Sequence, residues 1–125
     1  MNRRGFTLIE IMMAVVILGI VLLGTARFTA QFLHTVSIST VRTVAAEVAQ
    51  ERIELVSTDP SYTTLAARWA ATETGFPGFP RMQRQTTVAR TTGTTPPRDY
   101  TTVTVTVTEP TLYTPVKVTT TVGRP

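Results

Sequence analysis

One uninterrupted apolar segment near the start of the chain constrains its fold more than any other feature. Residues 6–26 carry a single charge, that of Glu10. As an α-helix this segment is about 31 Å long, which matches the hydrocarbon thickness of a bilayer. Arg3 and Arg4 lie just before it and predict that the N-terminus stays on the cytoplasmic side. The segment therefore predicts a single-pass transmembrane helix.

Three kinds of segment share this pattern. A secretory signal peptide would use Arg3 and Arg4 as its basic region and residues 24–26 as its cleavage site, but its apolar core is usually only about 7–15 residues long. A plain membrane anchor explains the length and the arginines. It leaves no purpose for Glu10, although an ionised carboxylate is costly inside hydrocarbon. The third interpretation rests on the residues at the beginning of the apolar run.

Residues 3–10 read Arg-Arg-Gly-Phe-Thr-Leu-Ile-Glu and lead directly into the apolar run. This string resembles the class III signal of type IV prepilins and of type II secretion pseudopilins. The resemblance implies a basic leader of residues 1–5, cleavage after Gly5 by a prepilin peptidase, and N-methylation of the new terminus, Phe6. It also implies the partners: other pilin or pseudopilin subunits, the inner-membrane assembly platform and membrane lipid.

The same resemblance implies a location. The chain is expected in a bacterial inner membrane, with its C-terminal head in the periplasm, and afterwards in a filament in the periplasm or at the cell surface. The expected function is that of a structural subunit of a type IV pilus or a type II secretion pseudopilus, assembled through the N-terminal helix.

Glu10 lies one helical turn after the amine that cleavage would create at Phe6. A carboxylate within a membrane needs a partner, and in a filament that partner would be the Phe6 amine of a neighbouring subunit. Because an unpaired charge in a low dielectric is costly, such a pair would set the axial register between subunits. In the other interpretation Glu10 snorkels or stays protonated and contacts only its own N-terminus.

The helical pattern continues well beyond the apolar segment. Residues 27–56 contain neither Pro nor Gly, and Pro60 then prevents further helix. This pattern predicts one helix from residue 6 to about residue 56. An apolar stripe with helical spacing predicts that residues 27–57 are amphipathic; its members are Phe28, Phe32, Val36, Val41, Val44, Val48 and Leu55. The charged residues between them are predicted to face solvent, namely Glu47, Glu51, Arg52 and Glu54.

A second, weaker likeness concerns the kind of subunit. Residues 45–55, AAEVAQERIEL, resemble the middle of the helix in minor pilins and small pseudopilins. Many major pilins carry a proline near the outer end of the apolar run, where this chain has Arg27. The resemblance therefore favours a minor pilin or minor pseudopilin.

The remainder, residues 58–125, is predicted to be a β-rich head. The chain has 27 threonines, 21 of them after Ser57, and threonine favours half-exposed strands. Alternating valines and threonines predict strands at about residues 82–91, 100–109 and 116–122, joined as an antiparallel meander. A short helix is expected at residues 65–70 and a loop at residues 75–80. The fold class is thus α+β, with the long helix packed on the valine face of a small antiparallel sheet.

Little in the sequence suggests catalysis. Cysteine is absent, the single histidine, His34, lies on the long helix, and the acids of the head lack the spacing of a calcium loop. We therefore expect no enzyme activity, no metal and no cofactor. Two alternatives stay open: a DNA-binding competence pilin, and a single-pass membrane-anchored β-domain. The first is disfavoured because the basic residues of the head are spread out, namely Arg68, Arg81, Arg84, Arg90, Arg98, Lys117 and Arg124.

Overall fold

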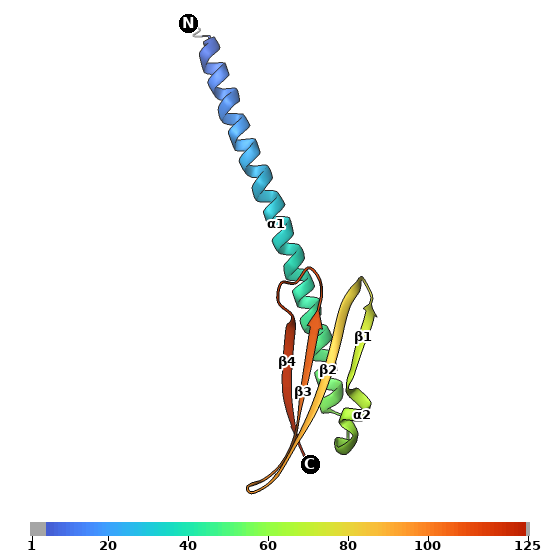
Figure 1. Ribbon diagram of the computed structural model, residues 1–125. Helices are drawn as coiled ribbons and strands as arrows, with labels where there is room; N and C mark the ends of the chain where they lie inside the picture. Colours follow the sequence, from blue (N-terminus) through green and yellow to red (C-terminus); the bar gives the residue numbers. More distant parts are fainter. Residues whose placement is uncertain (1–4, 125) are drawn as a thin grey trace. The chain divides into compact units, whose positions relative to one another are not determined.

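A computed structural model describes residues 5–124 of the chain. They fall into two compact units, one ending at Ser37 and the other, here called the C-terminal unit, beginning at Ile38. Helix α1 (Leu8–Ser57) runs through both (Figure 1). The prediction of one long helix is confirmed. Its first two expected residues, Phe6 and Thr7, lie before the helix begins.

The C-terminal end of α1 is set by Pro60 and by side chains that replace the helical hydrogen bonds. The hydroxyl of Ser57 donates to the carbonyl of Ile53 (2.7 Å), one turn earlier in the helix. Asp59 then accepts from the backbone N–H of Ser61 (2.8 Å), from Arg68 and from the indole of Trp69. The Ser61 N–H is the main reason why the pKa of Asp59 lies below its usual value.

These bonds order the turn into a 3-10 helix, η1 (Tyr62–Thr64), and a short helix, α2 (Leu65–Trp69). Four strands follow: β1 (Ala71–Phe76), β2 (Phe79–Thr94), β3 (Pro97–Thr108) and β4 (Val116–Gly123). They form one antiparallel sheet in the order β1-β2-β3-β4, so each strand pairs with its neighbour in sequence (Figure 1). The short helix, the three predicted strands and the meander are confirmed, and β2 extends beyond its predicted ends on both sides.

The expected loop at residues 75–80 is shorter than predicted, since only residues 77 and 78 lie outside the strands. It is a tight hairpin connection between β2 and a fourth strand, β1, that the sequence did not reveal. Gly75 and Gly78 have φ angles of +84° and +77°, a region that L-residues with a Cβ avoid. The sequence of β1, ATETGF, lacks the apolar alternation by which a strand is recognised.

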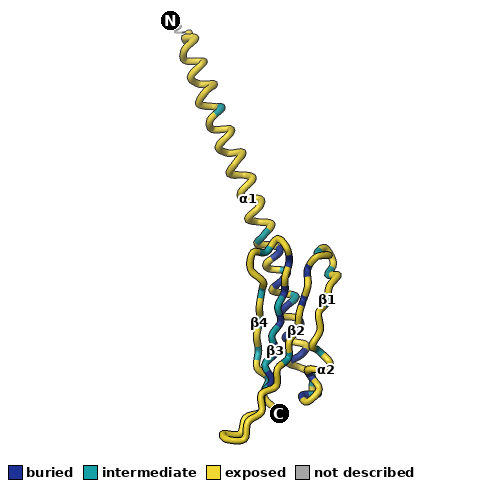
Figure 2. The backbone as a smooth tube through the Cα atoms, viewed as in Figure 1, coloured by how far each residue is buried: buried dark blue, intermediate teal, exposed yellow. Residues whose placement is uncertain are grey.

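The core of the C-terminal unit lies between α1 and one face of the sheet. The helix contributes residues spaced three or four apart, namely Val41, Ala45, Ala49, Ile53 and Val56. The sheet contributes Met82 of β2 and the three valines of β3, Val103, Val105 and Val107, all with no exposed surface. The predicted contact between the valine face and the helix is therefore confirmed, and Figure 2 shows the buried positions along both.

The predicted stripe differs from the buried face of α1 at several positions. Three members near its start are exposed, namely Phe28 (69%), Phe32 (57%) and Val36 (44%). Leu55 is 46% exposed, while Arg52, expected in solvent, is only 7% exposed. The buried face passes instead through Ala45 and Ala49, which have no exposed surface. At 3.6 residues per turn, Leu55 lies about 120° around the helix from Ala49 and about 160° from Ile53, so it points away from the face that they share.

Arg52 is buried because β1 supplies its counter-charge. Glu73 of β1 forms ion pairs with Arg52 of α1 and with Arg84 of β2, both through its Oε2 atom. The two guanidinium groups also stack on aromatic rings, Arg52 on Trp69 (5.1 Å) and Arg84 on Phe76 (5.2 Å). Burial raises the pKa of Glu73, but the hydrogen bonds from Arg84 and Arg52 outweigh it, so its pKa lies below the usual value.

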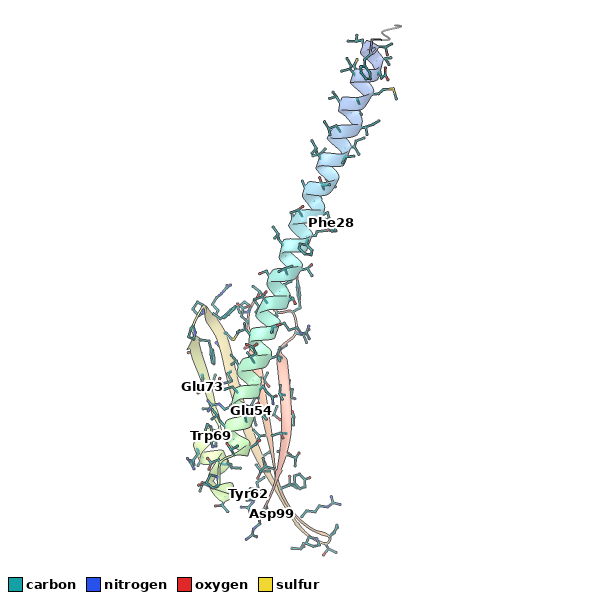
Figure 3. All side chains as sticks on the ribbon, turned by 180° about the vertical axis from the view of Figure 1, so that it is seen from behind. Phe28, Glu54, Tyr62, Trp69, Glu73 and Asp99 are labelled. Atoms are coloured by element: carbon teal, nitrogen blue, oxygen red, sulfur yellow. The ribbon has the colours of Figure 1, made fainter. Side chains whose placement is uncertain are left out.

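A second ion pair lies near the β2–β3 connection. Arg90 donates two hydrogen bonds to Asp99 (2.9 and 2.7 Å), and the hydroxyl of Tyr62 donates a third at 3.0 Å. Figure 3 shows Tyr62 and Asp99 at this end of the sheet. The hydrogen bonds from Arg90 are the largest cause of the lowered pKa of Asp99, which is about 2. The hydrogen bond from Tyr62 ties the η1 turn to the sheet.

Candidate functional site

The unit that ends at Ser37 consists of the first 30 residues of α1 and the short segment before them. Its residues from Gly5 onward are exposed, except for Gly19, which is half-buried (Figure 2). They include an almost continuous set of large apolar side chains between Phe6 and Leu33. The helix is long and apolar enough to cross a membrane. So much exposed apolar surface needs lipid or protein around it.

Thr7 caps the N-terminus of α1, just before its first residue, Leu8. The carbonyl of Thr7 accepts from the N–H groups of Glu10 (3.1 Å) and Ile11 (3.3 Å), and its hydroxyl lies 3.4 Å from the nitrogen of Glu10. This is one half of the capping box, in which a Ser or Thr is followed three residues later by Glu. Thr7 therefore satisfies backbone donors that the first turn of a helix otherwise leaves free.

Glu10 occupies that first turn. A negative charge there interacts favourably with the positive end of the helix dipole. Glu10 and Phe6 line the same shallow groove along the helix, together with Ile11, Ala14, Val15 and Leu18. Among residues 5–124, no side chain or backbone group bonds to the Glu10 carboxylate. Two of the predicted site residues thus lie together, and the charge of one of them has no partner in the described part of the chain.

The predicted cleavage bond joins Gly5 to Phe6, and both residues lie outside helix and strand. Phe6 is 79% exposed. An exposed bond whose backbone is not committed to a helix is open to a protease. Arg3 and Arg4, the predicted basic leader, lie outside the described residues.

The sequence reasoning identified Glu10 but missed Thr7. The signal was available, since Thr7-Leu8-Ile9-Glu10 has the spacing of a capping box immediately before an apolar run. The sequence also did not reveal that Glu73 and Asp99 form ion pairs with arginines. Their partners, Arg52, Arg84 and Arg90, are 9 to 21 residues away in sequence, and no local pattern connects them.

The remaining candidate residues, which could serve catalysis, metal binding or DNA binding, do not form a site. His34 is exposed on α1. In residues 5–124, His, Asp and Glu side chains nowhere gather in a group of three that could hold a metal ion. Four of the seven basic residues of the head are paired with carboxylates, which reduces the positive charge that is left for phosphate groups; these four are Arg68, Arg84, Arg90 and Arg124.

Comparison with known proteins identifies the N-terminal segment. The family described as the prokaryotic N-terminal methylation motif matches residues 1–26, the leader and the apolar run. No curated protein and no solved structure matches the chain. The motif is that of a substrate of prepilin peptidase, and the apolar helix behind it is that of a membrane-anchored subunit. The motif, followed by one long helix and an antiparallel sheet, supports a type IV pilin/pseudopilin-like protein.

Proposed function

We propose that the chain is a minor pilin or minor pseudopilin, a non-enzymatic subunit whose N-terminal helix is packed into a filament after processing. Cleavage after Gly5 releases the basic leader, and methylation follows on the amine of Phe6. The observation that carries the proposal is the match of residues 1–26 to the methylation motif at the head of an exposed apolar helix. The site needs no cofactor, because its chemistry is done by the processing enzyme.

Glu10 then acts in assembly. Its carboxylate has no partner in the described part of its own chain, although it lies in a segment that is otherwise apolar. A charge in such a segment is costly until it is paired. The Phe6 amine of a neighbouring subunit supplies the opposite charge, and because such a pair forms at one relative height only, it sets the axial register. Before assembly, the head lies in the periplasm and the N-terminus in the cytoplasm.

The processing step is tested by mass spectrometry of the N-terminal peptide. The full chain is expressed in a bacterial host with and without a prepilin peptidase. With the peptidase, we expect the mature chain to begin at methylated Phe6; without it, the chain should begin at Met1. A chain that begins at residue 27, or that keeps its leader in the presence of the peptidase, contradicts the proposal.

The assembly step is tested by replacing Glu10. Glu10→Gln keeps the size and the hydrogen-bonding capacity of the side chain and removes its charge. We expect membrane insertion and cleavage to continue while incorporation into filaments falls at least tenfold. Glu47→Gln is the matched control, because Glu47 is exposed on the same helix, in the C-terminal unit. Normal incorporation of the Glu10 variant would refute the register role without affecting the processing.

A further inference from the structure

The sheet leaves two strands with a partner on one side only. In the order β1-β2-β3-β4, β1 pairs with β2 and β4 pairs with β3. Within residues 5–124, no strand extends the sheet beyond either of them. A free strand edge presents backbone N–H and C=O groups at the spacing of a sheet, and another strand can add to it.

The edge of β4 carries few of the features that normally prevent such addition. Its eight residues pair with β3 without a register shift, and they include no proline. Its only charge is Lys117. The edge of β1 is regular over residues 71–74, and its register with β2 then shifts between Thr74 and Phe76. Both edges therefore have a regular segment of at least four residues.

The apolar side of β4 is also incompletely covered. Every second residue faces the helix side of the sheet and is half-buried, namely Val116, Val118, Thr120 and Val122. The valines among them pack on the core, but the sheet ends there, so one flank of each side chain is open. A neighbouring strand would cover this flank, because side chains on adjacent strands contact one another on the same face.

The direction of the strands indicates which strand of a second copy can pair with the free edge of β4. In an antiparallel meander of four strands, β1 and β4 point in opposite directions. All four strands run alongside the C-terminal part of α1 (Figure 1). Copies anchored in one membrane by the same helix have their helices, and hence their equivalent strands, pointing the same way. The β1 strand of one copy therefore meets β4 of the next in antiparallel orientation.

Pairing two β4 strands is less favourable in that arrangement. They would run parallel, a slightly weaker pairing, and the helices would lie on opposite faces of the joint sheet. The charges point the same way: Lys117 is the only charged residue of β4, and Glu73, an acid, is the only one of β1. A β4–β1 pair thus brings no like charges together in any register.

We propose that β4 of one subunit pairs with residues 71–74 of β1 in a second copy of the chain, so that one sheet spans the two heads. The proposal rests on the membrane-anchored filament subunit proposed above, and it adds a contact between heads to the contact between helices. On the face away from the helix, Thr119 and its neighbours then lie beside Thr72 and Thr74 of the second copy.

Disulfide cross-linking tests this contact, because the natural chain contains no cysteine. Two differently tagged full-length chains are produced together in bacterial membranes with a prepilin peptidase. One carries Thr119→Cys and the other carries Thr72→Cys or Thr74→Cys, since the stagger between copies decides which threonine lies opposite. Directly opposite side chains in antiparallel strands have Cβ atoms about 4.5–5.5 Å apart, which is near the spacing of a disulfide.

After mild oxidation, we expect the mixed disulfide in one of these two pairs, at least fivefold above that between Thr119→Cys and Ala71→Cys, whose side chain is on the helix side. The control for folding and oxidation is Thr104→Cys with Thr119→Cys in one chain, because these residues are paired and their hydroxyl oxygens are 3.3 Å apart. This control should close within the chain.

Two results would overturn the contact. One is the absence of the mixed disulfide while the Thr104–Thr119 control closes. The other is a Thr119→Cys homodimer that exceeds the mixed product, which indicates that this face of β4 meets its own copy and not β1 of the second copy. Processing is measured in the same samples. Normal processing and incorporation without the mixed disulfide reject only the strand pairing, whereas an unprocessed chain rejects the proposed function.

Discussion

Arg84 of β2 donates from its Nε atom to Oε2 of Glu73 on β1, at 2.8 Å, and Arg52 of α1 reaches the same oxygen. One carboxylate therefore connects the helix to two strands of the sheet. The three side chains lie beside Trp69 and Phe76, over which the two guanidinium groups stack. Figure 3 shows Glu73 and Trp69 in this region. The cluster fixes β1, which has little apolar surface of its own, onto the rest of the C-terminal unit.

Glu73→Gln should lower the free energy of unfolding by about 2 kcal/mol. Removing one partner of a fully buried ion pair costs about 3–5 kcal/mol. We expect less here because the Glu73 side chain is 36% exposed and water can partly replace it. Urea denaturation of the full chain in detergent micelles measures the change, and Trp69, the only tryptophan, reports on it by fluorescence. Glu47→Gln makes the same change in charge on the exposed face of α1 and should leave the midpoint within error.

Asp99 should make the C-terminal unit sensitive to acid. Its pKa in the folded chain is about 2, against a usual value of 3.8. A carboxyl group with a lowered pKa contributes stability that is complete above its unfolded pKa and is lost as the pH falls through its folded pKa. The contribution of Asp99 is therefore present above about pH 4 and should disappear between about pH 4 and pH 2.

The measurement compares the wild-type chain with Asp99→Asn. The wild type should be the more stable of the two at neutral pH, and the difference should shrink towards zero near pH 2. Other carboxyl groups with lowered pKa values, such as Asp59 and Glu73, titrate in both proteins and cancel in the difference. A difference that stays constant from pH 5 to pH 2 would show that Asp99 does not hold its charge against Arg90.

The hairpin that joins β1 to β2 should require glycine at position 78. Gly78 has a φ angle of +77°, and a Cβ atom built there would meet nothing within 4 Å. The cost of Gly78→Ala is thus that of the backbone conformation alone, about 1–2 kcal/mol. Thermal unfolding of the full chain in micelles gives this value. Gly123→Ala is the control, since Gly123 also has open space around it but no positive φ; equal losses at both positions would contradict the backbone explanation.

The two faces of β3 should respond differently to truncation. Val105 has no exposed surface, whereas its neighbour Thr106 lies on the other face and is half-buried. Val105→Ala removes buried methyl groups and leaves a cavity, so it should destabilise the chain by about 2 kcal/mol. Thr106→Ala should change stability by no more than about 0.5 kcal/mol. The urea midpoints of the two variants measure these losses. If Thr106→Ala lost more stability than Val105→Ala, the two faces of β3 would be assigned wrongly.

The long helix and three of the four strands could be predicted because their signals are local. The apolar run, the absence of Pro and Gly before Pro60, and the alternation of valine and threonine in β3 each lie within one element. The buried face of α1 was harder to predict. The sequence suggested the larger residues, including Leu55, but Ala45 and Ala49 lie against the sheet. Which face is covered depends on where the strands pack, and that contact joins residues far apart in the chain.

Strand β1 could not be predicted for a related reason. It is held by pairing with β2 and by the ion pairs of Glu73, not by an apolar pattern of its own. The burial of Arg52 follows from its ion pair with Glu73, since burying a charged side chain is costly unless an opposite charge pairs with it. At the N-terminus, the residues of the candidate site could be named in advance, and the structure added the helix-capping role of Thr7.

The sequence by itself determined the apolar helix, its single carboxylate and the processing motif, because each is encoded in consecutive residues and depends only on the chemistry of those residues. Tertiary structure alone decided the fourth strand, the buried arginines and the two free edges of the sheet. These features arise when segments such as Glu73, Arg52 and Arg84 come together, and the free energy of such contacts depends on burial and on partners that no local pattern specifies.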